Sequence, residues 1–395
     1  MLLEVRDLQV EFRTRDGVAQ AVNGVSYGVD EGETLAVLGE SGSGKSVTAQ
    51  AVMGILDSPP GRVSGGQVLF RGRDLLTLKE AERRRVRGAE IAMIFQDALS
   101  ALNPVLSVGT QLAEMYTVHR KLKRKEARAR AVELMERVGI PAAAERAGDY
   151  PHQFSGGMRQ RIMIAMALAL EPALIIADEP TTALDVTVQA QVMELLAGLR
   201  DEFAMGLILI THDLGVVADV ADRIAVMYAG RIVETAPVHA IYRAPAHPYT
   251  RGLLDSVPRL DQKGHELYAI RGLPPNLQRI PPGCAFHPRC PIARDICRTD
   301  VPPLYEAGPG RLSACHFWRE TLAGAAGAAG PGGAAGAAGA AGPGGAGGAG
   351  GTGSAGGTGG ARGSGDGGTA AEPGAAAGPD PGPATPGGEE ADGRD

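Results

Sequence analysis

The chain has 395 residues and a formal net charge of −6, and its length allows two or three domains. Because its body is nearly neutral, the composition argues against a large nucleic-acid footprint, and we expect no nucleic-acid partner. The most apolar window, residues 162–176, is broken by Glu171 and Pro172 and is shorter than the roughly 20 residues of a membrane span. Residues 1–4 lead into an alternating strand pattern rather than a long apolar core, so we expect a cytoplasmic protein without a secretory leader.

The first elements predict a strand, a glycine-rich loop and a helix. Residues 8–12 alternate between apolar and polar, residues 34–38 form an apolar strand, and residues 46–56 are compatible with a helix. Between the last two, residues 39–46 read Gly-Glu-Ser-Gly-Ser-Gly-Lys-Ser, a phosphate-binding loop. Glycines remove the Cβ atoms that would keep backbone N–H groups from a polyphosphate. The loop predicts a nucleotide-binding protein, and a glycine-rich turn without a ligand is the alternative.

Each polar residue of this loop has an expected partner. Lys45 can reach the β- and γ-phosphates, Ser46 can offer its hydroxyl to magnesium, and the positive end of the following helix faces the anion. We expect the nucleotide to be bound by Gly39, Ser41, Gly42, Ser43, Gly44, Lys45, Ser46 and Val47.

Further strands are predicted by short apolar runs. They lie at residues 67–70, 91–95, 174–178, 207–211 and 224–227. Continuous apolar strands such as residues 173–177 favour a mostly parallel sheet with helices on both faces. Residues 96–150 instead read as helical, and the amphipathic helix 125–138 is stopped by Gly139 and Pro141. We predict an α/β ATPase domain over residues 1–242 with a helical insert.

Two carboxylates close the apolar strand 173–177. Asp178 and Glu179 stand where a parallel strand reaches the ligand edge of the sheet. Asp178 can hold magnesium, directly or through water, and Glu179 can polarise or deprotonate the water that attacks the γ-phosphate. The alternative, an acidic surface turn, is disfavoured by the phosphate loop upstream.

Residues 154–160 read Phe-Ser-Gly-Gly-Met-Arg-Gln and precede the helical run 161–170. Together with Gln96, Asp185 and His212, this segment resembles the motif order of the ATP-binding cassette (ABC) ATPases over residues 1–242. The resemblance implies a RecA-like, mostly parallel sheet core, an antiparallel β subdomain and a helical subdomain at about residues 96–159.

In this family two domains pack head to tail, and each ATP lies between the phosphate loop of one and the signature segment of the other. Ser155, Gly156 and Gly157 would then supply a hydroxyl, bare N–H groups and a helix N-terminus to the γ-phosphate. Within one chain the same residues read as an ordinary helix cap.

The resemblance also assigns roles to residues that mean little alone. It implies that Gln96 links magnesium and the attacking water to the transport partner, that Asp185 communicates between the two sites, and that His212 contacts the γ-phosphate. The expected catalytic set is Lys45, Gln96, Glu179 and His212, and the expected magnesium ligands are Ser46, Gln96 and Asp178. Phe12 matches the aromatic that stacks on adenine, although its alternation fits a core residue nearly as well.

One position departs from the family pattern. The signature usually ends in glutamine, and here Met158 cannot replace the amide hydrogen bonds. The ATP site that this segment completes could therefore hydrolyse differently from the site built on Lys45 and Glu179. We expect a heterodimer of unlike ATPase subunits.

Residues 243–322 predict a C-terminal extension. Residues 244–251 and 282–290 resemble the extension of oligopeptide and dipeptide importer ATPases, which nickel and some sugar importers share. All four cysteines of the chain fall inside it, namely Cys284, Cys290, Cys297 and Cys315. Disulfides are disfavoured in a cytosolic protein, so neighbouring thiols indicate a shared metal or cluster. The spacings lack Cys-x-x-Cys pairs, and a 4Fe-4S cluster, which the resemblance implies, zinc and free thiols stay open.

Residues 323–395 contain little besides glycine, alanine and proline. Such a segment cannot bury enough apolar surface to offset the entropy of ordering it, so we predict a disordered tail.

The resemblance implies an ATP-hydrolysing motor subunit of an ABC importer that takes up dipeptides or oligopeptides, peripheral at the cytoplasmic face of the membrane. Its expected partners are a second ATPase subunit, two transmembrane permeases and an extracytoplasmic binding protein. The alternatives are import of nickel, heme or another small solute, a soluble ABC ATPase without a transport role, and a metal-sensing module.

Overall fold

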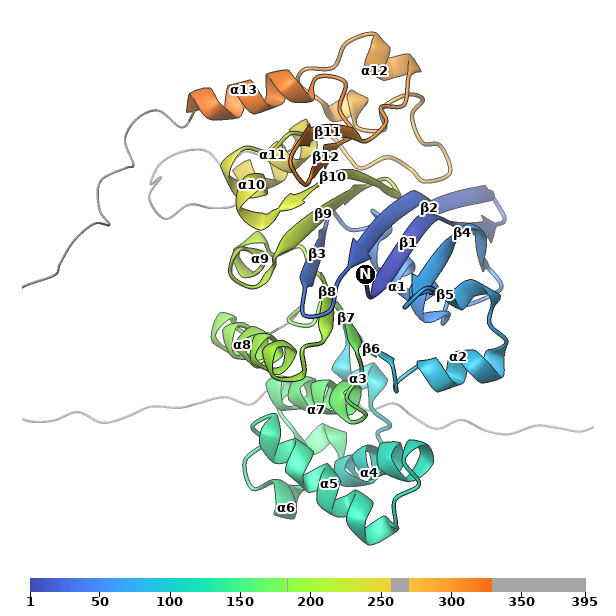
Figure 1. Ribbon diagram of the computed structural model, residues 1–395, viewed down its shortest axis with the longest axis vertical. Helices are drawn as coiled ribbons and strands as arrows, with labels where there is room; N and C mark the ends of the chain where they lie inside the picture. The colour runs from blue at the N-terminus through green and yellow to red at the C-terminus, as the bar shows by residue number, and fades with distance from the viewer. Residues whose placement is uncertain (183, 257–269, 329–395) are drawn as a thin grey trace, which may run out of the picture. The chain divides into compact units, whose positions relative to one another are not determined.

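The computed structural model describes residues 1–182, 184–256 and 270–328. Its largest sheet has eight strands in the order β11-β12-β10-β9-β3-β8-β7-β6 (Figure 1). Five of them, β9, β3, β8, β7 and β6, are mutually parallel, whereas β10, β12 and β11 continue the sheet antiparallel. The strands are β3 (Thr34–Leu38), β6 (Ile91–Ile94), β7 (Leu174–Asp178), β8 (Gly206–Ile210), β9 (Arg223–Tyr228), β10 (Arg231–Pro237), β11 (Tyr305–Gly308) and β12 (Arg311–Ser313). The predicted parallel core is confirmed.

A second, antiparallel sheet has the order β2-β1-β4-β5. It consists of β1 (Leu3–Thr14), β2 (Gly17–Val29), β4 (Gly61–Phe70) and β5 (Arg73–Asp74). Its inner face shares one buried core with helix α1 (Lys45–Met53) and with one face of the parallel strands. The phosphate loop therefore follows strand β3, which is buried on both sides.

The helices between β6 and β7 form the predicted helical subdomain. They are α3 (Ala98–Ala101), α4 (Val108–His119), α5 (Arg124–Arg137), α6 (Ala143–Arg146) and α7 (Gly156–Leu168). On α5 the buried residues Ala127, Ala131, Leu134 and Met135 follow a helical period, which explains why this face packs inward. Gly139 then takes a φ of +76° and ends the turn.

The remaining helices flank the sheets or belong to the extension. They are α2 (Glu80–Val86), α8 (Val186–Phe203), α9 (Leu214–Val220), α10 (Val238–Arg243), α11 (Pro248–Asp255), α12 (Ile296–Thr299) and α13 (Trp318–Ala328), with 3-10 turns at Leu75–Thr77, Pro151–Gln153 and His287–Arg289. Helix α1 ends at Met53 and not near residue 56 as predicted, because Gly54 adopts a left-handed φ of +64° and its N–H caps the helix.

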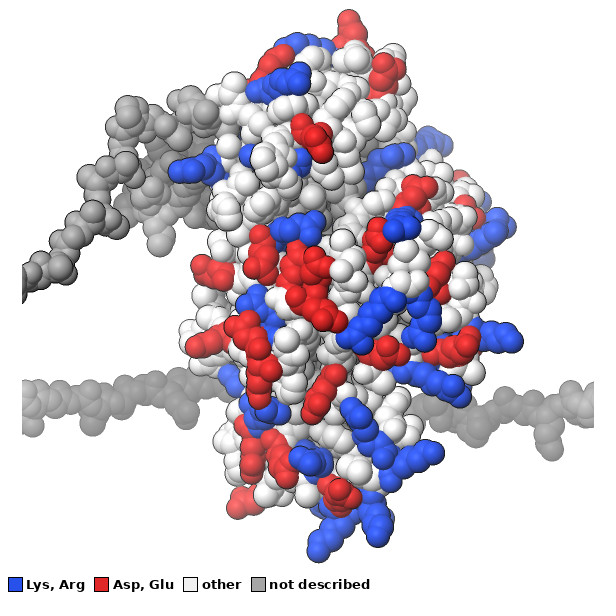
Figure 2. Space-filling view, in the orientation of Figure 1, with Lys and Arg blue, Asp and Glu red and all other residues white. Residues whose placement is uncertain are grey.

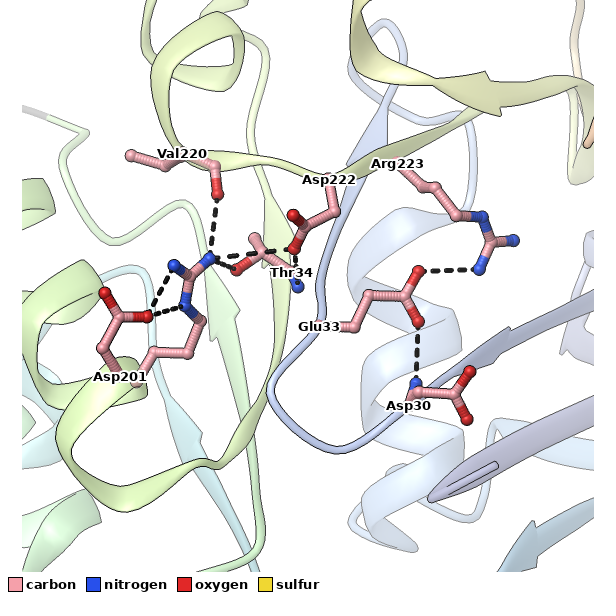
Figure 3. A network of polar contacts seen from close by, with 8 residues as sticks. Asp30, Glu33, Thr34, Asp201, Val220, Asp222 and Arg223 are labelled. Carbon is pink, nitrogen blue, oxygen red and sulfur yellow. Dashed lines mark hydrogen bonds and ion pairs between the residues drawn. The ribbon is translucent and has the colours of Figure 1, made fainter.

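A polar network links the N-terminal ends of strands β3 and β9 to helices α8 and α9 (Figure 3). Arg200 on α8 donates to the Thr34 hydroxyl at the start of β3 and to the Val220 carbonyl at the end of α9. The Asp222 carboxylate accepts the Thr34 backbone N–H at 2.7 Å, and Arg223 pairs with Glu33 at 2.8 Å. These contacts lie at the opposite strand ends from the phosphate loop, so they serve the fold.

The C-terminal extension continues the central sheet. Strand β12 pairs with β10 through the register Glu234↔Ser313, and Phe286 is buried in the same core as the parallel strands. Helix α13 runs to Ala328, six residues past the predicted boundary at 322. The rest of the predicted tail, residues 329–395, lies outside the described residues.

A buried carboxylate anchors this extension. Glu234 on β10 is fully buried, and its oxygens accept the backbone N–H groups of Ala246 at 2.6 Å and His247 at 2.9 Å. Arg311 on β12 lies 3.5 Å away. Burial raises the pKa of Glu234, which these N–H groups and the Arg311 charge oppose.

Charges on the surface are mixed in sign. On the face in Figure 2 basic and acidic side chains are interspersed. In two basic stretches of the sequence, residues 83–87 and 121–130, Arg84 and Arg87 pair with Glu80, and Arg130 pairs with Glu133. In the described parts of the chain, no helix is long and apolar enough to cross a membrane.

Candidate nucleotide site and cysteine cavity

The phosphate loop connects β3 to α1, and close backbone contacts fix two of its glycines. A Cβ on Gly39 would lie 2.3 Å from the Met227 carbonyl oxygen, and one on Gly44 would lie 2.3 Å from the Ala21 carbonyl oxygen. Gly44 also takes a φ of +101° as the N-cap of α1. These positions exclude any side chain, so the loop approaches the site with bare backbone.

Lys45 is almost fully buried at the start of α1. Its ammonium donates to the carbonyl oxygens of Gly39 at 2.8 Å and Glu40 at 3.0 Å, which uses two of its three donors. Burial lowers the pKa of Lys45, while the carboxylates of Glu179, Asp178 and Glu40 oppose that shift. The loop thus places one cation at its centre.

Ser46 and Asp178 lie in contact. The Ser46 hydroxyl donates to the Asp178 carboxylate at 2.9 Å, across 132 positions of sequence. Burial raises the pKa of Asp178, and the bond from Ser46 opposes this. A hydroxyl and a carboxylate together suit magnesium, which prefers oxygen ligands. Nearby, the buried Ser43 hydroxyl has no hydrogen-bond partner among the described residues, as expected of an atom that a phosphate would satisfy.

Glu179 is the meeting point of three side chains. Its carboxylate accepts from Gln96 Nε2 at 2.9 Å and from Thr182 Oγ1 at 3.0 Å, and His212 Nδ1 lies 3.5 Å from its other oxygen. Glu179 has a left-handed φ of +47°, a strained conformation for this residue that occurs at functional sites. The structure therefore brings together Gln96, Glu179 and His212, which come from the ends of three adjacent parallel strands.

The sequence pattern did not predict that Thr182 belongs to this site. It follows Glu179 by three residues in Asp-Glu-Pro-Thr-Thr, and hydroxyl residues at that distance often bond back across a turn. This spacing could have indicated the contact.

The signature residues are presented to solvent. Ser155 is the N-cap of α7 and accepts the Met158 N–H, and both Ser155 and Asp185 are exposed. Among the described residues, no hydrogen bond joins Ser155, Gly156 or Gly157 to the phosphate loop of the same chain. The Met158 sulfur accepts from Arg146 at 3.2 Å. Within a single chain, the N-terminus of helix α7 is therefore exposed to solvent.

Phe12 lies half buried on β1 and packs against the core of the antiparallel sheet, as Val47 does from α1. Its role toward adenine stays a prediction.

The four cysteines line one small cavity of the extension. Cys284, Cys290, Cys297 and Cys315 surround it together with His247, Phe286, His287 and Phe317. No disulfide joins them. Burial raises the pKa of the Cys290 thiol to about 11 and that of Cys315 to about 12. In the described parts of the chain, no three His, Cys, Asp or Glu side chains converge closely enough to hold a single metal ion.

Two family descriptions match the sequence. "ABC transporter" matches residues 22–182, which include the phosphate loop, Glu179 and the signature segment. "Oligopeptide/dipeptide transporter, C-terminal region" matches residues 233–297, which include three of the four cysteines.

Curated relatives match most of the chain. The oligopeptide transport ATP-binding protein OppD of Bacillus subtilis is 54% identical over 306 residues, 77% of this chain and 86% of that protein. OppD of Salmonella typhimurium is 53% identical over 80% of this chain and 93% of that protein. The dipeptide transport ATP-binding protein DppD of Bacillus subtilis is 54% identical over 75% and 88%.

Solved structures share the fold. The ATP-binding cassette MJ0796, described as a dimer in a post-hydrolysis state bound to ADP and Pi, superposes with a TM-score of 0.54 at 26% identity over 60% of this chain and 98% of that chain. cbiO1 from Clostridium perfringens, part of the transporter complex cbiONQ, gives a TM-score of 0.52 at 29% identity over 61% and 90%.

Proposed function

The chain belongs to the family of ABC transporter ATP-binding proteins for oligopeptides and dipeptides, and from this premise we propose that its ATP hydrolysis drives peptide uptake through membrane permeases. The chain is an ATPase of the ABC type. The observation that carries the peptide assignment is the C-terminal region match at residues 233–297, beyond the domain that all ABC ATPases share.

Within the site, we assign the roles by geometry and chemistry. Lys45 and the bare loop backbone bind the β- and γ-phosphates, and Ser46 with Asp178 holds magnesium, whose charge neutralises the phosphates when bound. Glu179 accepts a proton from the attacking water, because its carboxylate is fixed by Gln96 and Thr182 and faces the same loop. His212 lies beside Glu179 and contacts the γ-phosphate.

The uncovered helix N-terminus at Ser155 supports a head-to-tail dimer in which this segment completes the site of a sister subunit. The description of MJ0796 as a dimer supports a dimer of such domains. Met158 in place of the usual glutamine favours an unlike sister subunit, and so a heterodimer. Two permeases and an extracytoplasmic binding protein complete the assembly, with this chain at the cytoplasmic face of the membrane.

The cysteine cavity favours a 4Fe-4S cluster over zinc in our proposal. Four thiols line one cavity, and four cysteine thiolates are the ligand set of a 4Fe-4S cluster. Iron and sulfide analysis with visible absorbance after anaerobic purification tests this, with Cys297→Ser as the variant. A brown protein with iron and sulfide that Cys297→Ser loses supports the cluster, and a colourless protein with stoichiometric zinc contradicts it.

Transport is tested with the assembled importer in proteoliposomes. We expect uptake of labelled tri- to pentapeptides to require internal MgATP and to exceed uptake of nickel ions or heme. ATP-driven uptake of nickel or heme without peptide uptake would assign the same machinery to another cargo. ATP turnover with no transport of any of them would favour a soluble ABC ATPase.

A further inference from the structure

The C-terminal extension contacts the phosphate loop at Glu40, a loop residue that the phosphate-binding motif does not require. Arg289 ends the 3-10 turn His287–Arg289, and its guanidinium forms a bidentate ion pair with Glu40, with Nη1 to Oε2 at 2.6 Å and Nη2 to Oε1 at 2.9 Å. Glu40 is the second residue of the loop, 249 positions away. Bidentate arginine–carboxylate pairs fix geometry as well as charge.

This pair is sheltered. The Arg289 side chain is 5% exposed, and the Glu40 side chain is 26% exposed. The guanidinium lies 5.8 Å from the ring centre of Tyr228 and 6.0 Å from that of Phe286, and its Nε donates to the Arg271 carbonyl. With its donors occupied and its side chain covered, Arg289 is placed to hold Glu40 and not to touch a phosphate itself.

The backbone of Glu40 is held from the same side. Its N–H donates to the Tyr249 hydroxyl at 2.8 Å. Tyr249 comes from α11 of the extension, is fully buried, and packs against Tyr228 and Phe286 with ring centres 4.6 Å and 5.4 Å away. Both the side chain and the backbone of one loop residue are therefore fixed by the extension.

Glu40 in turn positions the loop's cation. Its carbonyl oxygen accepts from Lys45 Nζ at 3.0 Å and from the Ser43 N–H at 3.2 Å. A displacement of the Glu40 peptide would move both the ammonium and an N–H group at the heart of the phosphate site. Release of the Glu40 carboxylate from Arg289 would also add an unpaired negative charge beside the polyphosphate.

We propose that Arg289 is a positioning residue for ATP binding: with Tyr249 it holds Glu40 so that the phosphate loop and Lys45 keep the geometry that accepts a polyphosphate. The proposal rests on the proposed function only in that the loop binds ATP, and it extends that function by making the extension part of the nucleotide site. It needs no transport activity.

Equilibrium titration of the full-length chain with a fluorescent ATP analogue and magnesium tests the proposal. Arg289→Ala should weaken binding about tenfold or more, and Arg289→Lys, which keeps the charge but not the bidentate pair, should recover part of it. Arg294→Ala is the matched control, because Arg294 pairs with Glu320 on the exposed surface of the same extension. Its affinity should stay within twofold of the wild type.

A double-variant comparison separates positioning from general damage. If Arg289 acts through Glu40, adding Arg289→Ala to Glu40→Gln should weaken binding little beyond Glu40→Gln alone. Equal affinity of Arg289→Ala and wild type would overturn the proposal, as would full additivity of the two changes. If Arg289→Ala fails to fold, Arg289→Lys and Glu40→Gln are measured in its place. A loss of affinity of about threefold or more in these variants supports the proposal, and an affinity within about twofold of the wild type overturns it. A chain that binds the analogue but transports nothing would count against the proposed function alone.

Discussion

Gly39 and Gly42 both belong to the phosphate loop, but alanine should fail at them for different reasons. At Gly39 an added Cβ would lie 2.3 Å from the Met227 carbonyl oxygen, so backbone must move. At Gly42, with a φ of +77°, a Cβ would meet no atom of the described chain within 4 Å. Gly32 has a φ of +73° and equal space, and it lies in a turn outside the loop, so it is the matched control.

The expected magnitudes follow from these contacts. A Cβ at a left-handed position costs about 1–2 kcal/mol, so Gly32→Ala and Gly42→Ala should lower Tm by similar amounts, roughly 2–8 °C. Gly39→Ala should lower it clearly further, because displacing packed backbone adds about 1–3 kcal/mol. ATP affinity should instead fall at least about tenfold for Gly42→Ala, because its Cβ would occupy open space in the loop where we expect the phosphates to bind, and stay unchanged for Gly32→Ala.

Thermal unfolding of the full-length chain, with titration of a fluorescent ATP analogue, measures both effects. Equal affinity of Gly42→Ala and Gly32→Ala for the analogue would contradict the phosphate-binding role of Gly42, and equal unfolding temperatures of Gly39→Ala and Gly42→Ala would contradict the backbone clash at Gly39.

Three further predictions use contacts away from these glycines. Glu234→Ala should lower the free energy of unfolding by about 3–5 kcal/mol, because it leaves two buried N–H groups and the Arg311 charge without a partner. The exposed control Glu31→Gln should leave the midpoint of chemical unfolding unchanged. Equal midpoints for Glu234→Ala and Glu31→Gln would contradict this prediction. Arg200→Ala should cost about 1–3 kcal/mol yet leave ATP affinity unchanged, because its partners lie at the far strand ends; a tenfold loss of affinity would disprove that separation. Ser46→Ala should raise the magnesium concentration needed for half-maximal ATP turnover several-fold, and an unaltered magnesium titration would remove Ser46 from the metal site.

The parts of the fold that the sequence predicts are those with local signals. Long apolar runs placed the parallel strands within a residue or two, and the glycine spacing placed the loop. Strands β11 and β12 were not predicted because they are short and polar, and only the pairing of β12 with β10 and of β11 with β12 makes them strands. For the same reason the sequence pattern did not indicate that the extension predicted for residues 243–322 continues the central sheet.

Contacts between distant residues were beyond the sequence pattern. The motif order predicted that Gln96, Glu179 and His212 belong to one site, and the strand order brings them together. Nothing local to Glu40 indicates an arginine 249 residues later, because the pairing depends on how the extension folds back. The roles assigned to Phe12, Ser155 and Asp185 need a bound nucleotide or a second subunit, so they stay predictions.

In the proposed mechanism Glu179 activates the water that attacks ATP bound by Lys45. The direct test is phosphate release at saturating MgATP by the assembled importer carrying Glu179→Gln, with analogue binding measured in parallel. Glu179→Gln should slow phosphate release at least about a hundredfold and keep the affinity for the analogue, since glutamine preserves the shape of the side chain but cannot accept the proton. Release at the wild-type rate would contradict it.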